Sequence, residues 1–408
     1  MSENSSTSRL QVTKFKLNAL LEVTQAINEN PSREKLLSRY ETLLRKELKI
    51  GKILLYKLGE NWECLLSSGL NGAQYEIDVE KDLLGFEGIS FISSDTRSQV
   101  KGFDIAIPVI RDNRHLAIAL IGDIDEESEG VSPVIKHLHF IQTLSNIIVV
   151  AIENIRLNEE NVRQAAIKKE LELASRLQEM LIPGAGRLPS GGAFSVSAFY
   201  HPHMDIGGDY YDFIELSRNQ YGFCICDVSG KGISAALIMA NFQANMRAIF
   251  NCDILLEELV QRLNDRVNES TMGERFLTLF IGKYNTRTRE LIYVNAGHNP
   301  PLLYNKATKS LTHLESHCVG IGMIEEMPPI VARKLIIEKD VKLLCYTDGL
   351  VEILNEDLVE SGTDVIEAFL ANRDPIAGNI DEIVRHHGIL EGNKSIFDDI
   401  TILGFEFS

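Results

Sequence analysis

The sequence lacks the features that define several large classes of protein. It contains no window of about 18 uninterrupted apolar residues, which a membrane-spanning helix would need. Its start, MSENSSTSRL, is polar and does not resemble a secretory signal. No internal repeat or low-complexity tract is visible. We therefore expect a cytoplasmic protein with no membrane partner.

Basic charge is also scarce, because 41 Lys and Arg residues face 58 Asp and Glu residues and the net charge is −17. Proteins that bind nucleic acid usually present a basic face to the phosphate backbone. We therefore expect no nucleic-acid partner, whereas divalent cations remain suitable ligands. The acidity is concentrated after residue 150, since residues 1–150 carry a net charge of −4 and the remainder −13.

Cysteines are few and scattered. The one close pair, Cys224 and Cys226, alternates as residues of a strand do. We interpret the cysteines as buried, reduced thiols rather than as zinc ligands or disulfides. The remaining four are Cys64, Cys252, Cys318 and Cys345.

The length of 408 residues and the content of 44% hydrophobic and 24% charged residues indicate a globular chain of about two to three domains. After a polar tail over 1–14, apolar spacing predicts two helices within 15–50. Strand-like runs then predict hairpins at 51–69 and 105–124. We expect a first domain over 15–150 with helices and an antiparallel sheet.

A helical pattern begins near Val131 and continues through a linker over 151–184. Its apolar residues approximate a heptad seam, although Lys169 and Arg176 lie near that seam. Two interpretations remain open, a parallel coiled coil between two protomers and a single solvated helix. We expect the coiled coil, and with it a homodimer through the linker and the first domain. The seam consists of Ile155, Val162, Ala166, Leu173, Leu177 and Met180.

The C-terminal part, 190–408, begins with strand-like runs, continues with helical patterns at 232–250 and 253–270, and then returns to strand-like runs. This order favours an α+β layered sandwich over a doubly wound parallel sheet. The expected fold class of the whole chain is therefore α+β, with a long helical linker between two domains.

Aspartates follow or adjoin turns in four separate segments of this part, GGDYYDF, CDVSGKG, YTDGL and FDDIT. We interpret each as ending a strand, which would put carboxylates at the rim of a sheet. Hard divalent cations prefer such oxygen ligands, and two cations about 4 Å apart can activate water for phosphoryl transfer. Any one of these aspartates alone could simply cap a turn. The aspartates are Asp209, Asp227, Asp348, Asp398 and Asp399.

These segments, with NAGHNPP between them, resemble the SpoIIE-like branch of the bacterial PPM-type, metal-dependent serine/threonine protein phosphatases. The resemblance covers about 190–408 and implies an α/β-β/α sandwich with two Mn²⁺ or Mg²⁺ ions. It implies that the ions and their activated water are held by Asp209, Asp227, the backbone carbonyl of Val228, Asp348 and Asp398. Asp399 takes second rank because relatives often have Asn there.

Other residues have weaker assignments. Gly208 permits close backbone approach beside Asp209. Asn295 and His298 of NAGHNPP either support the site or are structural, and we do not assign them as ligands. Lys231 either orients phosphate or faces water. The phosphate-binding arginine of eukaryotic relatives has no evident counterpart, so the group that holds the substrate phosphate is not identified.

The first domain resembles a GAF sensor domain in the order of its elements, two helices, hairpin strands, a variable region, further strands and an outgoing helix. Neither a cyclic-nucleotide signature nor a chromophore-attaching cysteine is present. Its signal, a small molecule or a protein, stays unassigned.

Together these resemblances predict a sensor-regulated phosphatase. The family resemblance implies that its substrate is a phosphorylated anti-anti-sigma protein with a STAS fold. The alternatives are a catalytically inactive signalling scaffold and a ligand receptor. A scaffold has no need to keep several mutually repelling carboxylates together.

Overall fold

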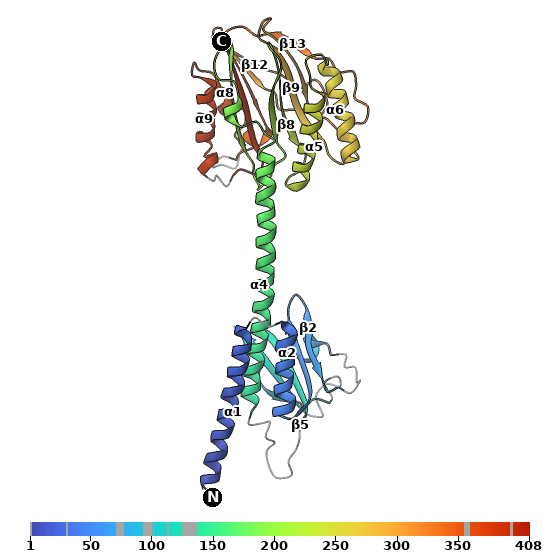
Figure 1. Cartoon of the computed structure of the whole chain (residues 1–408), viewed down its shortest axis with the longest axis vertical. Coiled ribbons are helices and arrows are strands. Elements are labelled where there is room, and N and C mark those ends of the chain that lie inside the picture. Colours follow the sequence, from blue (N-terminus) through green and yellow to red (C-terminus); the bar gives the residue numbers. More distant parts are fainter. Residues whose placement is uncertain are drawn as a thin grey trace. The chain divides into compact units, whose positions relative to one another are not determined.

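A computed structural model of the chain forms two compact units, Met1–Ala166 and Ile167–Ser408 (Figure 1). The structure describes residues 2–29, 32–70, 77–92, 100, 102–111, 114–124, 137–354, 360–391 and 395–408.

The N-terminal unit contains one five-stranded antiparallel sheet, with strands in the order β2-β1-β5-β4-β3. Both predicted hairpins are confirmed, since β1 pairs with β2 and β4 pairs with β5. The strands are β1 (Ile50–Leu58), β2 (Trp62–Ser68), β3 (Ser90–Phe91), β4 (Ile105–Arg111) and β5 (Arg114–Ile124).

Helices cover one face of this sheet. Ile53 and Leu55 of β1 pack with α1 (Ser2–Asn28), α2 (Arg33–Thr42) and the start of α4 (Leu138–Glu179), whereas Leu54 packs on the opposite face beside α3 (Val79–Asp82). This alternation is the period of two that a strand imposes. The hydroxyl groups of Tyr40 on α2 and Ser145 on α4 lie 2.6 Å apart inside this core.

Helix α1 begins at Ser2, so it extends through the residues expected to form a polar tail. Nothing in residues 2–28 stops a helix, because the stretch contains neither glycine nor proline. Helix α2 begins where expected, with the Ser32 side chain accepting a hydrogen bond from the backbone N–H of Lys35.

Helix α4 changes character along its length. Its first part is buried, with Ile141, Leu144 and Ile148 fully enclosed, whereas Leu173 and Leu177 are 53% and 65% exposed. One 18-residue window of α4 has a mean hydropathy of 1.4, so by length and composition it could pass as a membrane span. Half of that window is buried in the unit, and the core helices of soluble proteins pass the same test.

The C-terminal unit contains two five-stranded sheets, β13-β10-β9-β8-β7 and β12-β11-β14-β15-β6, and every pairing within them is antiparallel. The first sheet consists of β7 (Tyr210–Ser217), β8 (Gln220–Val228), β9 (Leu277–Asn285), β10 (Glu290–Ala296) and β13 (Arg333–Ile336). The second consists of β6 (Phe194–His201), β11 (Leu302–Asn305), β12 (Ser310–His313), β14 (Val341–Tyr346) and β15 (Ile400–Phe407).

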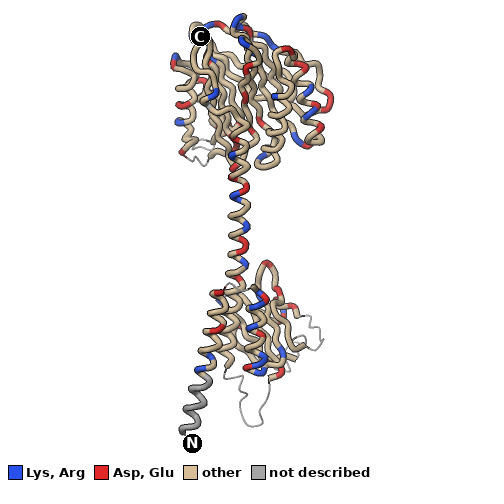
Figure 2. The backbone as a smooth tube through the Cα atoms, viewed as in Figure 1, with Lys and Arg blue, Asp and Glu red and all other residues tan. Residues whose placement is uncertain are grey.

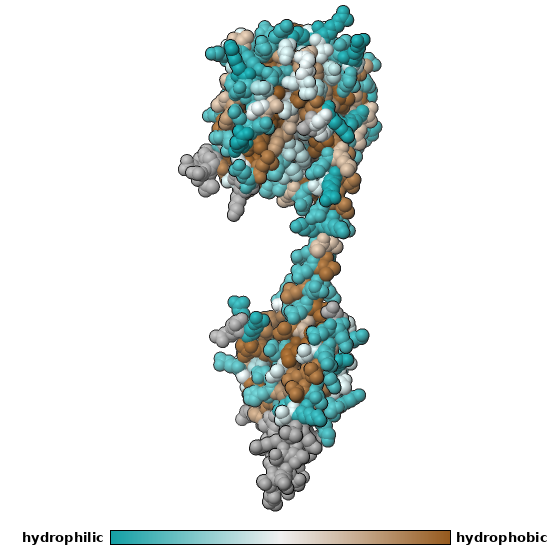
Figure 3. Space-filling model, turned by 60° about the vertical axis from the view of Figure 1, so that its left-hand side comes forward, coloured by the Kyte–Doolittle hydropathy of each residue, from teal (hydrophilic) through white to brown (hydrophobic). Residues whose placement is uncertain are grey.

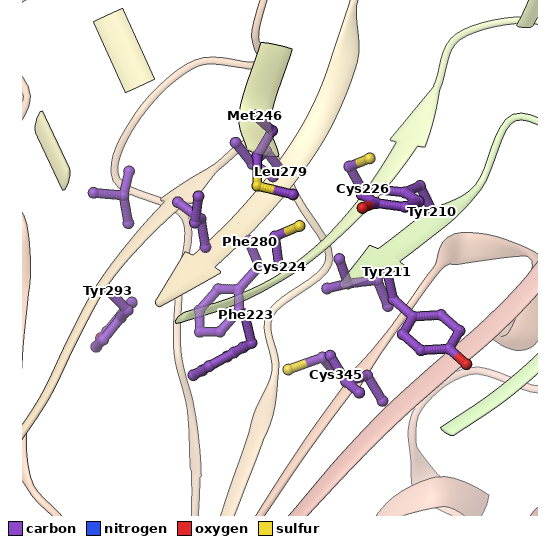
Figure 4. Close-up of a cluster of buried hydrophobic side chains, with 14 of the residues drawn as sticks. Tyr210, Tyr211, Phe223, Cys224, Cys226, Met246, Leu279, Phe280, Tyr293 and Cys345 are labelled. Carbon is purple, nitrogen blue, oxygen red and sulfur yellow. The ribbon is translucent and has the colours of Figure 1, made fainter. Parts of the chain in front are cut away.

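The two sheets pack face to face around aromatic side chains. Phe223 of β8 and Phe405 of β15 meet with ring centroids 4.4 Å apart, close enough for a favourable aromatic contact. Figure 4 shows three cysteines within this core, Cys224, Cys226 and Cys345. All six cysteines are free thiols, which confirms the expectation of no disulfide, although Cys64 is exposed rather than buried.

Helices α5 (Ile233–Ile249) and α6 (Leu256–Thr271) cover the first sheet, as their apolar spacing predicts. Helices α8 (Asp364–Leu370) and α9 (Ile376–His386) pack on the second sheet (Figure 1). The layers therefore run helix, sheet, sheet, helix. Within the described residues, the fold is α+β, with an antiparallel N-terminal sheet, a long helix and a C-terminal sandwich.

Candidate metal centre

The candidate aspartates gather at one rim of the sandwich. Asp227 lies near the end of β8, and Asp348 follows β14 as the first residue of α7 (Asp348–Val351). Asp209 precedes β7, and Asp398 and Asp399 precede β15, so the expectation that all of the aspartates end strands is wrong for these three. Because neighbouring strands are antiparallel, the start of one strand lies beside the end of the next, which keeps the carboxylates at the same rim.

Asp209 is seated between the two sheets. Its side chain is buried, and its Oδ2 accepts hydrogen bonds from Thr347 Oγ1 at 2.7 Å and Thr401 Oγ1 at 2.6 Å. Both threonines belong to the second sheet or its edge, whereas Asp209 leads into the first. These two hydroxyl groups fix the orientation of Asp209.

Asp399 holds the backbone that precedes Asp209. Its Oδ2 accepts the N–H of Gly208 at 2.6 Å, and its Oδ1 accepts the N–H of His203 at 2.8 Å. A Cβ atom at Gly207 would lie 2.6 Å from Asp399 Oδ2, so only glycine fits there. Both oxygens of Asp399 thus bind backbone N–H groups.

Gly208 brings two backbone segments together. A Cβ atom at this position would lie 3.0 Å from the carbonyl oxygen of Val228. The absence of a side chain at Gly208 therefore leaves that oxygen open toward the loop that carries Asp209. Val228 itself is buried at the end of β8, so its carbonyl is held by the strand rather than by a mobile loop.

Burial and mutual repulsion raise the pKa of four carboxyl groups here. Burial, then the charges of Asp227 and Asp399, raises the pKa of Asp209 well above its usual value. Burial, then repulsion from Asp348, Asp398 and Asp399, raises the pKa of Asp227 to about 7, although a hydrogen bond with Asp209 offsets part of this. The pKa values of Asp348 and Asp399 are raised mainly by burial. A cluster of this kind favours either protons or cations.

The donor set suits Mg²⁺ or Mn²⁺, because every candidate ligand is a carboxylate or carbonyl oxygen. Within the described part of the chain, no three acidic, His or Cys side chains converge closely enough to hold one ion as they stand. Backbone and side-chain contacts nevertheless hold Asp209, Asp398 and Asp399 at the same rim, since Thr401 binds Asp209 and Asp399 binds the N–H of Gly208. Ion binding would therefore have to draw these carboxylates together.

Lys231 lies against this cluster. Its Nζ forms an ion pair with Asp398 Oδ2 at 2.7 Å and donates to the Phe397 carbonyl at 2.5 Å. Of the two interpretations from sequence, a side chain that merely faces water does not describe this arrangement.

Asn295 and His298 lie beside the strand pair β8–β9, which carries Asp227. The Asn295 side chain accepts the N–H of His298 at 2.9 Å and donates to the Leu314 carbonyl at 3.0 Å. His298 Nδ1 lies 2.8 Å from Thr278 Oγ1, and Thr278 is the strand partner of Asp227. Burial lowers the pKa of His298 to about 3, so it stays neutral.

Three polar residues near the rim were not identified from sequence. Thr347 and Thr401 hold Asp209, as described above. Gln178, in the last turn of α4, donates to the Gly207 carbonyl at 2.5 Å and accepts the Gly207 N–H at 3.1 Å. The available signals were the positions of Thr347 directly before Asp348, in YTDGL, and of Thr401 two residues after Asp399, in FDDIT.

A second carboxylate of the GGDYYDF segment has a different role. Asp212 is fully buried and accepts two hydrogen bonds from Arg247 of α5, at 2.7 and 2.9 Å. The Tyr210 hydroxyl donates to the same carboxylate at 2.5 Å. This ion pair connects α5 to β7 at a position three residues after Asp209.

Comparison with known proteins finds relatives of the C-terminal unit. Residues 217–408 match the family model described as stage II sporulation protein E (SpoIIE). The match begins after Asp209 and includes Asp227, Asp348, Asp398 and Asp399. The chain is 27% identical over 194 residues to the phosphoserine phosphatase RsbU of Bacillus subtilis (strain 168), covering 48% of this chain and 57% of that protein.

A second relative and a solved structure agree with this match. The chain is 28% identical over 191 residues to the phosphoserine phosphatase RsbP of the same organism, covering 45% of this chain and 46% of that protein. It thus spans about half the length of these relatives. The SiaA-PP2C domain of Pseudomonas aeruginosa superposes with a TM-score of 0.52 and 19% identity, covering 60% of this chain and 99% of that domain. That likeness shows a PP2C-like fold.

Proposed function

We propose that this chain, which carries a SpoIIE-type phosphatase domain at its C-terminus, is a metal-dependent phosphatase of phosphoserine and phosphothreonine in proteins. The observation that carries the proposal is the gathering of buried and half-buried carboxylates with raised pKa values at one rim. Two relatives named phosphoserine phosphatases support the same chemistry.

Two Mn²⁺ or Mg²⁺ ions would be held by the carboxylates and the carbonyl of the rim. When bound, such ions supply the Lewis acidity that makes water nucleophilic and stabilises charge on the phosphoryl oxygens. Thr347 and Thr401 would keep Asp209 in one orientation, and Asp399 would keep the loop before it in place. The proposed ligands are Asp209, Asp227, Val228 (carbonyl), Asp348 and Asp398.

We further propose a phosphorylated anti-anti-sigma protein of STAS fold as the substrate, and control of a sigma factor as the outcome. The support is the likeness to RsbU and RsbP and the order of the motifs. The net charge of −17 fits a protein partner better than a nucleic acid. A cytoplasmic location is part of the same proposal.

The N-terminal unit would act as the sensor, with a GAF-like fold and a small molecule or a protein as its signal. Its support is a five-stranded antiparallel sheet with helices on one face and a second apolar cluster on the other. A signal can alter output only if it binds two states of the protein unequally.

A homodimer through α4 would connect sensor and phosphatase. Exposed apolar side chains along this helix support it, and Figure 3 shows them as brown patches among hydrophilic residues. Charged residues of both signs lie between them (Figure 2), as on the outer faces of a coiled coil. Leu173→Ser with Leu177→Ser should convert the dimer to monomer in sedimentation and change turnover, whereas Glu172→Ser with Arg176→Ser should not dissociate it. A sedimentation coefficient and a turnover that both stay at wild-type values would refute the linker proposal.

Hydrolysis of a chromogenic phosphomonoester by the full chain tests the activity. Turnover should require Mn²⁺ and fall at least about 10³-fold in Asp209→Asn and in Asp348→Asn. Asp381→Asn, at an exposed position on α9, is the matched control and should be unaffected. A folded full chain that is inert toward both this ester and a phosphoserine peptide would favour the inactive scaffold.

A further inference from the structure

Lys231 lies where two loops of the candidate metal centre meet. It belongs to the turn between β8, which carries Asp227, and α5. Its ammonium contacts Asp398 and the carbonyl of Phe397, both in the segment before β15. The side chains of Lys231 and Asp398 are 43% and 28% exposed, so the pair lies at the mouth of the rim rather than in its interior.

The Lys231 ammonium neutralises part of the negative charge at the mouth of the rim, because it lies 2.7 Å from Asp398 Oδ2. A divalent cation that binds Asp398 must compete with this ammonium, because two positive charges at one carboxylate repel.

The backbone around Lys231 is fixed, whereas its side chain can move. Arg275 Nη1 donates to the Ser229 carbonyl at 3.1 Å, and the Ser229 N–H binds the Phe276 carbonyl at 2.9 Å. Gly230 on the near side has φ +95°, and a Cβ atom there would lie 2.0 Å from Arg275 Nη1. The lysine stem has four rotatable carbons, so the ammonium can turn away from Asp398 without movement of the turn.

We propose that Lys231 is a displaceable counter-ion of the metal centre. Its ammonium would leave Asp398 when a divalent cation binds there, and would then bind the phosphate of the substrate. This inference rests on the proposed function. A phosphomonoester dianion has oxygens that the cations do not cover, and a nearby ammonium is a suitable donor to them. The structure offers Lys231 for the phosphate-binding role that the sequence left unassigned.

The proposal predicts two effects of opposite sign in Lys231→Gln. Loss of the competing charge should tighten Mn²⁺ binding, whereas loss of the phosphate donor should weaken the binding of orthophosphate and raise KM. A lysine that only braced the two loops would move Mn²⁺ and phosphate binding in the same direction, or neither.

Calorimetric titration of the full chain with Mn²⁺ measures the first effect, and inhibition by orthophosphate at saturating Mn²⁺ measures the second. In Lys231→Gln we expect Mn²⁺ affinity to rise about two- to fivefold, the range of a part-exposed ion pair, and orthophosphate inhibition to weaken by a similar factor. Lys231→Arg should stay near wild type in both. Lys334→Gln, which removes a lysine paired with Glu290 on the surface, is the matched control.

Each outcome decides part of the proposal. Unchanged or weaker Mn²⁺ binding in Lys231→Gln overturns the counter-ion role, and unchanged orthophosphate inhibition overturns the phosphate role. A wild-type chain that binds Mn²⁺ but cleaves no phosphoserine contradicts the proposed function, while the Mn²⁺ titration still judges the counter-ion. A wild-type chain that binds no Mn²⁺ contradicts both.

Discussion

Two regions of the C-terminal unit bury a carboxylate on the same short segment, and they treat it in opposite ways. Asp212, between β7 and α5, meets the Arg247 guanidinium through two hydrogen bonds. Asp209, three residues earlier at the rim, meets two hydroxyl groups and the carboxyl groups of Asp227 and Asp399. Both side chains are almost wholly removed from solvent.

The difference separates a structural charge from a functional one. A buried carboxylate with a guanidinium partner is neutralised within the protein and contributes to packing. A buried carboxylate surrounded by other carboxylates carries a negative charge that the protein does not neutralise, and a bound cation can neutralise it. Burial alone would not have distinguished Asp209 from Asp212.

The largest expected effect is on catalysis. If the proposed function holds, Asp209→Asn should reduce Mn²⁺-dependent turnover at least about 10³-fold, because one of the proposed metal ligands is lost. Asp212→Asn should retain most of the turnover of the molecules that stay folded. Steady-state assays normalised to the folded fraction measure this, and equal losses in the two variants would break the comparison.

The second effect is on stability, with the opposite ranking. In EDTA, Asp212→Asn should lower the free energy of unfolding by about 2 kcal/mol, because Arg247 loses its buried partner but stays half exposed. Asp209→Asn should leave stability unchanged or raise it, since it removes repulsion. Urea unfolding gives both values. A destabilised Asp209→Asn would contradict the assignment of Asp209 as an unneutralised charge.

The third effect is a dependence on pH. A carboxyl group with a raised pKa in the folded state stabilises the fold fully below its unfolded pKa and loses that contribution as the pH rises through the folded pKa. His298, whose pKa is lowered to about 3, contributes with the opposite sign over part of this range, so the effect is measured as a difference between wild type and Asp227→Asn. Without metal, the stability of wild type relative to Asp227→Asn should fall between about pH 4 and about pH 7, the pKa of Asp227. Mn²⁺ should stabilise wild type at about pH 8, because cations replace the lost protons. Thermal unfolding of both proteins with EDTA or Mn²⁺ measures this, and a difference that rises over this range would contradict it.

The smallest expected effect is on Mn²⁺ affinity and concerns the hydroxyl group of Thr401, which orients Asp209. Thr401→Val keeps the shape of a buried side chain but removes the hydroxyl that donates to Asp209 at 2.6 Å. Mn²⁺ affinity should fall several-fold, because outer partners orient metal ligands. Thr312→Val, at an exposed position on β12, is the control in the same titration and should have no effect. An unchanged affinity in Thr401→Val would mean that Asp209 is oriented by other contacts.

Sequence reasoning identified the strands and the aspartates for a physical reason. Alternation and turn residues are local signals, and carboxylates beside turns in GGDYYDF and YTDGL are visible without a fold. The sequence did not reveal that Asp209 and Asp398 precede strands rather than follow them. In an antiparallel sheet the start of one strand lies beside the end of its neighbour, so a residue in either position reaches the same rim.

The partners of these aspartates were beyond sequence reasoning. Thr401 lies 192 residues from Asp209, and Asp212 is neutralised by Arg247 across 35 residues, so no local pattern connects them. His298 illustrates the same limit, because only its burial and its contact with Thr278 show that it braces the strand pair that carries Asp227.

The cysteines of the sandwich provide a chemical reporter. Burial raises the pKa values of the Cys224, Cys226 and Cys345 thiols well above the usual value, so in the folded unit they are neither accessible nor ionised. Cys64, exposed on β2, stays within reach of an alkylating reagent. Since thiolates are the reactive form, the three core thiols should be alkylated only when the sandwich opens. Mass spectrometry of alkylated protein would then time the opening of the C-terminal unit without any introduced label.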